Sequence, residues 1–194
     1  MAKAEAKPFV LNDALLNAYA TNDNITRYLI ENIDPKAWRA EPPGGKGRTI
    51  AAIVAHIHNV RVMWLKVINK EGPIPNQLDR QTVTPQQAIT ALARSGKDVS
   101  RVIAAALAAD GRVKYFKPDV AGFIGYSISH DAHHRGQISM LARQVGHAIP
   151  QKAMFGMWEW GSRDSNAAQS KSTGAAKPRP KKRRTKSLRG LSQP

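Results

Sequence analysis

The feature that most constrains the fold is a series of four helix-length segments, each bounded by proline, glycine or a capping residue. Within each segment apolar residues recur at three- and four-residue spacing, the period of an amphipathic helix. The segments cover residues 10–33, 50–69, 84–109 and 121–145. The sequence contains no strand-like alternation and no internal repeat. Four helices of this length joined by modest connectors predict an all-α chain, folded as an antiparallel four-helix bundle.

Local chemistry predicts where these helices begin and end. Pro35 ends the first, because a residue before proline avoids the α conformation. Thr49 can cap the second helix. Thr84, followed by proline and then by Gln87, is typical of a capped start to the third. Gly146 marks the end of the fourth helix, since glycine readily adopts the left-handed conformation found there.

The end of the chain differs in composition from the rest. Residues 165–194 hold nine Lys or Arg and no acidic residue, out of a formal net charge of +16 for the whole chain. A segment rich in Ser, Ala, Gly, Pro and basic residues buries too little apolar surface to offset its chain entropy. We therefore expect a helical domain over residues 1–164 and a disordered basic tail over 165–194. The tail can also make nonspecific, salt-dependent contacts with nucleic-acid phosphates.

Several kinds of protein are disfavoured by what the sequence lacks. It has no cysteine, which excludes disulfides, a cysteine nucleophile and thiolate metal ligands. No stretch approaches the roughly 20 apolar residues needed to span a bilayer. The N-terminal residues lack the apolar core of a signal peptide. We expect a cytoplasmic protein with no membrane partner.

Three of the six histidines point inward from two of the predicted helices. At about 100° per residue, His56 lies roughly 60° from the centre of the apolar stripe on the second helix. On the fourth helix, His130 and His134 lie roughly 70° and 30° from the centre of the stripe. Their i, i+4 spacing stacks the two imidazoles on one face. Three imidazoles from two facing helices can hold one divalent ion with an open coordination position, as in catalytic zinc sites. The alternative is that they are hydrogen-bonded core residues.

The remaining polar residues of these two helices are expected to face outward. His58 and His133 lie roughly 140° and 130° from the centres of their stripes. We expect both, and His147 after the fourth helix, to be solvated or locally hydrogen-bonded. Asp131 lies about 100° around the helix from His130, and we expect it on a solvated face.

The segments that carry the histidines resemble the DinB/YfiT-like metalloenzyme family. The resemblance lies in TIAAIVAHIHNVRVMWLK and in HDAHHRGQISMLARQVG, which is similar to the family's helix with the pattern H-x-x-x-H-R-G-Q. The segments AWRAEPPGGKGRTI and MWEWG are similar to one branch of the family. The resemblance spans about residues 10–162. The basic tail departs from the family pattern.

The resemblance implies a four-helix bundle, a homodimer, and a divalent metal ion held by His56, His130 and His134. These are the three residues that the helical phase selects. We expect zinc or nickel, with iron or manganese as alternatives. Relatives include thiol-dependent S-transferases and isomerases, and some hydrolases. We therefore expect a metal-dependent enzyme acting on a small molecule, with a low-molecular-weight thiol as one candidate partner. The alternative is a non-catalytic, stress-related or nucleic-acid-associated metal-binding protein.

Four further residues are candidates for the site. Trp64 and Tyr126 can line a substrate pocket, or they can simply fill the core. Arg135 can hold an anionic substrate, since its guanidinium fork suits carboxylates; the alternatives are a surface role or a helix-pairing role. Gln137 can hydrogen-bond a ligand imidazole. The sequence contains no HExxH motif and no inward carboxylate near the histidines, so the catalytic residues stay unassigned.

Overall fold

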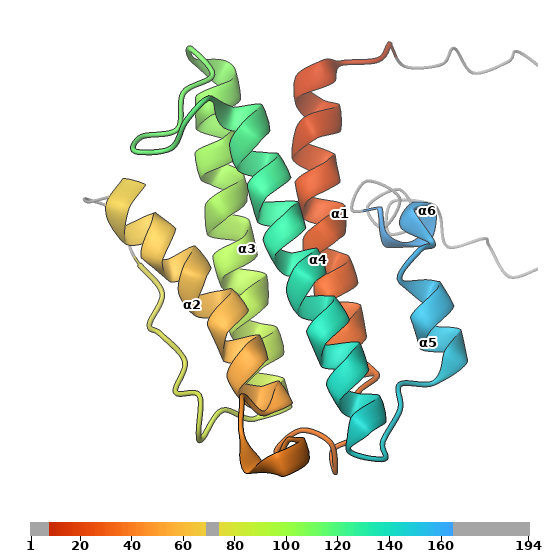
Figure 1. Cartoon of the computed structure of the whole chain (residues 1–194). Coiled ribbons are helices and arrows are strands. Elements are labelled where there is room, and N and C mark those ends of the chain that lie inside the picture. Colours follow the sequence, from red (N-terminus) through yellow and green to blue (C-terminus); the bar gives the residue numbers. More distant parts are fainter. Residues whose placement is uncertain (1–7, 69–73, 165–194) are drawn as a thin grey trace, which may run out of the picture.

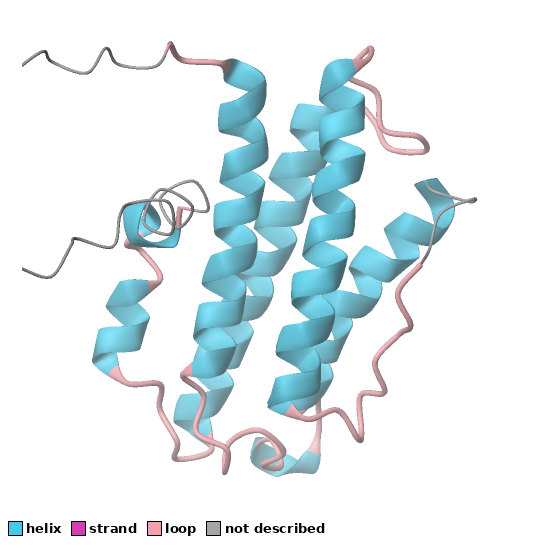
Figure 2. Ribbon diagram, turned by 180° about the vertical axis from the view of Figure 1, so that it is seen from behind, coloured by secondary structure: helices cyan, strands magenta, loops and turns pink. Residues whose placement is uncertain are grey.

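The computed structural model describes residues 8–68 and 74–164, so the predicted basic tail lies outside the described residues. Over these residues it contains six α-helices, one 3-10 helix and no strand (Figure 2). The elements are α1 (Leu11–Glu31), η1 (Pro43–Gly45), α2 (Ile50–Ile68), α3 (Pro85–Ala108), α4 (Val120–Gln144), α5 (Gln151–Gly156) and α6 (Trp160–Arg163). The predicted all-α class is confirmed. The four long helices begin and end within two residues of their predicted bounds.

Capping interactions explain these bounds. The Thr84 side chain accepts a hydrogen bond from the Gln87 amide, and the Gln87 side chain accepts one from the Thr84 amide, which completes the predicted capping box. Asp119, which the sequence analysis did not single out, caps α4 by accepting from the Gly122 amide at 2.8 Å. Gly146 has a φ of +82°, so the left-handed residue predicted after the last long helix is present.

The long helices pack side by side, but their directions do not simply alternate (Figure 1). α1 runs antiparallel to α3, because Asn12 near the start of α1 donates to the carbonyl of Leu107 near the end of α3 at 3.2 Å. α2 and α3 start at the same end. Trp38 shows this, since its carbonyl accepts from Ala51 in α2 and its indole donates to the Val83 carbonyl just before α3.

The expectation of an antiparallel arrangement is therefore correct for α1 with α3 and for α2 with α4, whereas α2 and α3 run parallel (Figure 1). The connector allows this. A helix of the length of α2 spans about 29 Å. The 16 residues between Ile68 and Pro85 can reach about 50 Å when extended, which is enough to return to the starting end.

Two apolar clusters form the core, and a buried polar layer separates them. One cluster surrounds Leu29, Ile57 and Leu92 at the end where α2 and α3 begin, and the other surrounds Tyr19, Ile103 and Phe123 at the opposite end. Each long helix contributes polar side chains near its midpoint to the layer between them. The buried polar residues are Thr21, Asn22, Asp23, Thr26, His58, Arg61, Ser95, Asp131 and His134.

α2 is the most apolar of the long helices. In the described part of the chain it is the one helix long and apolar enough, by length and composition alone, to cross a membrane. More than half of its apolar window is buried inside the protein, as in the core helix of a packed domain.

The segment after α4 packs against α1 as two short helices, where the sequence analysis recognised only an aromatic segment. Arg163 in α6 stacks its guanidinium on the Tyr28 ring at 3.5 Å from the ring centre. Its carbonyl accepts a hydrogen bond from the Asn24 side chain at 2.8 Å. These contacts hold α5 and α6 beside α1 (Figure 1).

Candidate metal centre

The structure brings His56 of α2 together with His130 and His134 of α4. The ring centres lie 5.4 Å apart for His56 and His130, 4.8 Å for His56 and His134, and 4.5 Å for His130 and His134. His134 is buried, whereas the other two are partly exposed. The cluster therefore lies between α2 and α4, level with the polar layer, and solvent reaches it.

The three side chains can hold one metal ion. They form the one group of three or more potential ligand side chains within the described residues, and their ligand nitrogens all lie within 4.8 Å of one another. Around a tetrahedral zinc with bonds of about 2.0–2.1 Å, two ligand nitrogens are about 3.4 Å apart. Side-chain rotation can close this difference. The donor set is purely imidazole, which suits zinc, nickel, copper and iron.

Gln137 fixes the orientation of His134. Its side-chain oxygen lies 2.8 Å from Nδ1 of His134, and its amide nitrogen lies 3.0 Å from Nε2 of His133. Because the amide oxygen can only accept, Nδ1 of His134 carries the proton and donates it to Gln137. The lone pair of His134 is then on Nε2, free for a metal. Gln137 therefore occupies the position that the sequence analysis proposed for it.

Asp131 performs a similar task beside His130. Its Oδ1 lies 3.6 Å from Nδ1 of His130. Its Oδ2 accepts hydrogen bonds from Arg61 at 2.7 Å and from Asn22 at 2.9 Å. The carboxylate is thus held from α1 and α2 while it faces the ring of His130.

Two of the three imidazoles, those of His56 and His134, are kept neutral by lowered pKa values. Burial lowers the pKa of His56 to about 4, and the nearby charges of His134 and Arg48 act in the same direction. Burial also lowers the pKa of His134, although its hydrogen bond with Gln137 opposes the shift. A neutral imidazole is the form that binds metal, so both side chains are ready for an ion at neutral pH.

Aromatic rings extend from the histidines along α2 and α4. Tyr126 stacks on His130 with ring centres 6.1 Å apart. Trp64 lies 5.9 Å from Tyr126 and donates its indole N–H to the tyrosine hydroxyl at 3.3 Å. Phe116 and Phe123 pack edge-on against Trp64. Tyr126 thus adjoins His130, and Trp64 lies beyond it, packed also against the core cluster around Tyr19, Ile103 and Phe123.

Arg135 is not brought to the histidines. Its Nη1 donates to the side chains of Asn22 and Thr26 in α1, at 2.8 Å each. Adjacent helical residues point about 100° apart, so Arg135 pairs α4 with α1 while His134 faces α2. Arg135 therefore makes helix-pairing contacts, which the sequence analysis named as one alternative for this residue.

Two predicted orientations are wrong. His58 was expected to face away from the core, but it is fully buried. Its Nδ1 lies 3.0 Å from the Ser95 hydroxyl in α3, and its Nε2 lies 2.9 Å from the Asn76 carbonyl in the connector. The reason is that α2 is covered on more than one side. Asp131 was expected on a solvated face but is only 2% exposed, because Arg61 neutralises its charge. His133 is exposed, as predicted.

The sequence analysis missed the centre of the polar layer. Arg61 in α2 is almost fully buried and bridges two carboxylates, that of Asp23 in α1 at 2.5 Å and that of Asp131 in α4 at 2.7 Å. It also donates to the Leu92 carbonyl in α3 at 3.3 Å. Charged residues at the midpoints of three otherwise core-forming helices were the available signal, because such charges require partners from other helices.

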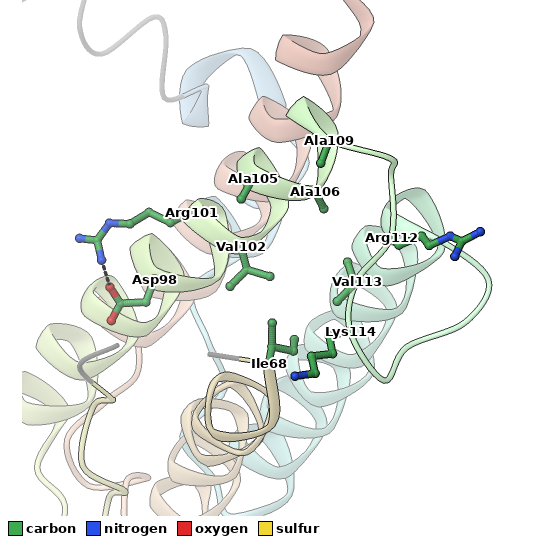
Figure 3. A pocket seen from close by; sticks show the side chains of 10 residues that line it. All are labelled: Ile68, Asp98, Arg101, Val102, Ala105, Ala106, Ala109, Arg112, Val113 and Lys114. Atoms are coloured by element: carbon green, nitrogen blue, oxygen red, sulfur yellow. Dashed lines mark hydrogen bonds and ion pairs between the residues drawn. The ribbon is translucent and has the colours of Figure 1, made fainter. Parts of the chain in front are cut away.

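The larger cavities lie away from the histidines. One of about 480 Å³ runs between the connector and α3 and includes His58 in its wall. Another of about 460 Å³ lies near the end of α2, where Asp98 pairs with Arg101 and Lys114 faces Ile68 (Figure 3). The cavity beside His130 holds only about 10 Å³. The histidine cluster therefore lies open between α2 and α4.

Comparison with known proteins gives one match. A family model described as the DinB family matches residues 8–163. The matched region covers most of the chain and includes all three clustered histidines. No curated protein and no solved structure matched the chain.

Proposed function

We propose that this chain, which belongs to the DinB family, binds one divalent metal ion through His56, His130 and His134 and acts on a small molecule there. Zinc and nickel are the preferred ions, with iron or manganese as alternatives. The observation that carries the proposal is the convergence of three imidazoles from two helices. Their ligand nitrogens lie within 4.8 Å of one another. We propose that these helices belong to a four-helix bundle. A divalent ion held there supplies a Lewis acid with an open coordination position.

The chain's own residues prepare the site. Gln137 accepts the Nδ1 proton of His134 and leaves Nε2 of that ring for the metal, while the Asp131 carboxylate lies 3.6 Å from Nδ1 of His130. Burial would raise the pKa of Asp131, but the charge of Arg61 and hydrogen bonds from His130 and Arg61 lower it below its ordinary value. The carboxylate is also buried, and its Oδ2 already accepts hydrogen bonds from Arg61 and Asn22. Asp131 therefore positions His130 and does not serve as the general base.

The substrate side is proposed to be the aromatic wall of Trp64 and Tyr126. An apolar or aromatic electrophile can lie against these rings with its reacting atom near the histidines. The thiol-dependent S-transferases among the relatives suggest transfer of a low-molecular-weight thiol to that electrophile. Hydrolysis is the other reaction in the proposal. In either case His130, stacked on Tyr126 at 6.1 Å, links the wall to the metal centre.

The test is turnover by the metal-loaded full chain. We would incubate it with an aryl halide and a panel of low-molecular-weight thiols, and separately with aryl esters. Product formation should stop when a chelator removes the metal and in His134→Ala. Trp64→Ala should raise KM more than it lowers kcat, because the indole binds substrate without touching the reacting atoms. Turnover that survives both chelation and His134→Ala would exclude a metal-dependent reaction at this site.

The second candidate is a non-catalytic, nucleic-acid-associated protein. Its support is the charge of residues 165–194, with nine basic residues and no acid. Retention on DNA without metal-dependent turnover would favour it. We also propose, from the family resemblance, that the chain forms a homodimer. Light scattering on the purified chain tests this oligomeric state.

A further inference from the structure

A further cavity lies on the face of α4 opposite the histidines. It encloses about 360 Å³ between α1, α4 and the segment that carries α5 and α6. Its walls are mostly apolar: Ile25, Ile128, Ala132, Met154, Met157 and two tryptophans, Trp158 and Trp160. Small-molecule sites in proteins have volumes of about 300–1,000 Å³ and similar linings. The shape and lining therefore suit a compact apolar or aromatic body.

Arg135 lines this cavity with no carboxylate of the described residues at ion-pair distance, although Asp131 attracts it from farther away. Arg135 is partly buried, and its two hydrogen bonds both run from Nη1 to neutral acceptors, Asn22 Oδ1 and Thr26 Oγ1. No described residue forms an ion pair with it. The nearby carboxylates are engaged elsewhere, since Asp23 pairs with Arg27 and Arg61, and Asp131 pairs with Arg61.

The charges of this region leave an excess of one positive charge. Three arginines, Arg27, Arg61 and Arg135, share two carboxylates. A partly buried guanidinium whose hydrogen bonds all go to neutral acceptors is stabilised by an anion that takes its remaining N–H groups. The cavity provides the place from which such an anion can reach it.

We propose that this cavity is a second binding site, for a small molecule with an aromatic or branched aliphatic body and one carboxylate. The carboxylate pairs with Arg135, and the body packs between Ile25, the two methionines and the tryptophans. Trp158 and Trp160 are 80% and 42% exposed, so they stand at the mouth and lose exposed surface when the ligand enters. This site is separate from the metal centre and does not depend on it.

The test is calorimetric titration of the full chain with 1-naphthoate and with its neutral counterpart 1-naphthamide. Naphthoate should bind at least about tenfold more tightly, because its carboxylate forms a charge-assisted hydrogen bond with Arg135 that the neutral amide cannot form. Arg135→Gln should remove this preference while naphthamide binding stays. Equal affinity of the wild type for both compounds, or no binding of naphthoate, would overturn the proposal.

A pair of glycines on α4 supplies a matched control that avoids damage to the fold. Gly136 lines the cavity and Gly125 does not, and a Cβ built on either meets nothing within 4 Å. Gly136→Leu should fill the cavity and weaken naphthoate binding at least about tenfold, whereas Gly125→Leu should leave it within about twofold. Binding that is unchanged in Gly136→Leu would refute the site. If naphthoate binding were lost in His56→Ala but kept in Gly136→Leu, the carboxylate would bind at the histidines. That result would also refute the proposed site.

Discussion

Replacement of Arg61 by methionine should strongly destabilise the protein. The change removes the guanidinium that bridges Asp23 at 2.5 Å and Asp131 at 2.7 Å and that donates to the Leu92 carbonyl. Asp23 and Asp131 are only 6% and 2% exposed, so both carboxylates would remain buried without their main partner. Removing one side of a buried ion pair costs about 3–5 kcal/mol. Arg27 still pairs with Asp23, so we expect a loss of about 4 kcal/mol, a large share of a typical total of about 5–15 kcal/mol.

Urea denaturation at pH 7, followed by circular dichroism, measures this loss. The matched control combines Arg61→Met with Asp23→Asn and Asp131→Asn. It removes both carboxylates that lose Arg61, so it should recover a large part of the lost stability. A loss below about 1 kcal/mol in the single variant would refute the reasoning, because it would mean that water or rearrangement solvates the carboxylates.

The pH dependence of the same variant gives an independent check. In the wild type the folded-state pKa of Asp131 is below its ordinary value. Its contribution is therefore complete above the unfolded pKa of about 3.9 and is lost as pH falls through the lower folded value. Without Arg61, burial raises the pKa of the carboxyl group, and the folded state takes up protons more readily than the unfolded state. Relative to the wild type, Arg61→Met should therefore gain stability as pH falls from 7 towards about 4. A constant difference between the two proteins over this range would contradict the assignment.

Three further predictions concern a glycine, the pH and the tail. Gly96→Ala should cost about 1–3 kcal/mol although alanine favours helices, because its Cβ would lie 2.6 Å from Asp23 Oδ1. Gly125→Ala should stabilise the protein by up to about 1 kcal/mol. Urea titrations that show a stability change of the same sign in Gly96→Ala and Gly125→Ala would contradict this prediction. The metal-free protein should lose stability as pH falls from about 6.5 to about 4, because the unfolded chain protonates His56 more readily than the folded chain. His56→Gln should flatten this dependence, and an unchanged slope would rule out the stated cause. Deletion of residues 165–194 should leave the melting temperature within a few degrees and remove most retention on heparin at low salt, whereas full retention would place the basic surface on the helices.

Local signals were sufficient to predict the long helices. The capping box at Thr84 and the left-handed residue at Gly146 depend on neighbours within a few positions, so the sequence alone specifies them. The same holds for the approach of His130 and His134, which are one helical turn apart. The family resemblance carried by their motif is confirmed.

Contacts between distant segments could not be read in this way. The phase of His58 was judged from one apolar stripe, whereas α2 is also covered by α3 and by the connector that contributes Asn76. Asp131 was judged by its own polarity, whereas its burial depends on Arg61, seventy positions away in the sequence. No periodicity along one helix reports which charge on another helix will face it. The direction of α3 depends in the same way on where a long connector leads.

Metal content is the most direct test of the central claim. We would purify the full chain without an affinity tag, supply zinc or nickel, and measure bound metal by mass spectrometry for the wild type and four single variants. The wild type and His133→Ala, whose side chain is exposed on the same helix, should each hold about one ion per chain. His56→Ala, His130→Ala and His134→Ala should each lose most of it, because two imidazoles hold an ion poorly. Retention of the ion by His56→Ala, His130→Ala and His134→Ala would contradict the proposed metal centre. Loss of the ion from His133→Ala alone would contradict it as well.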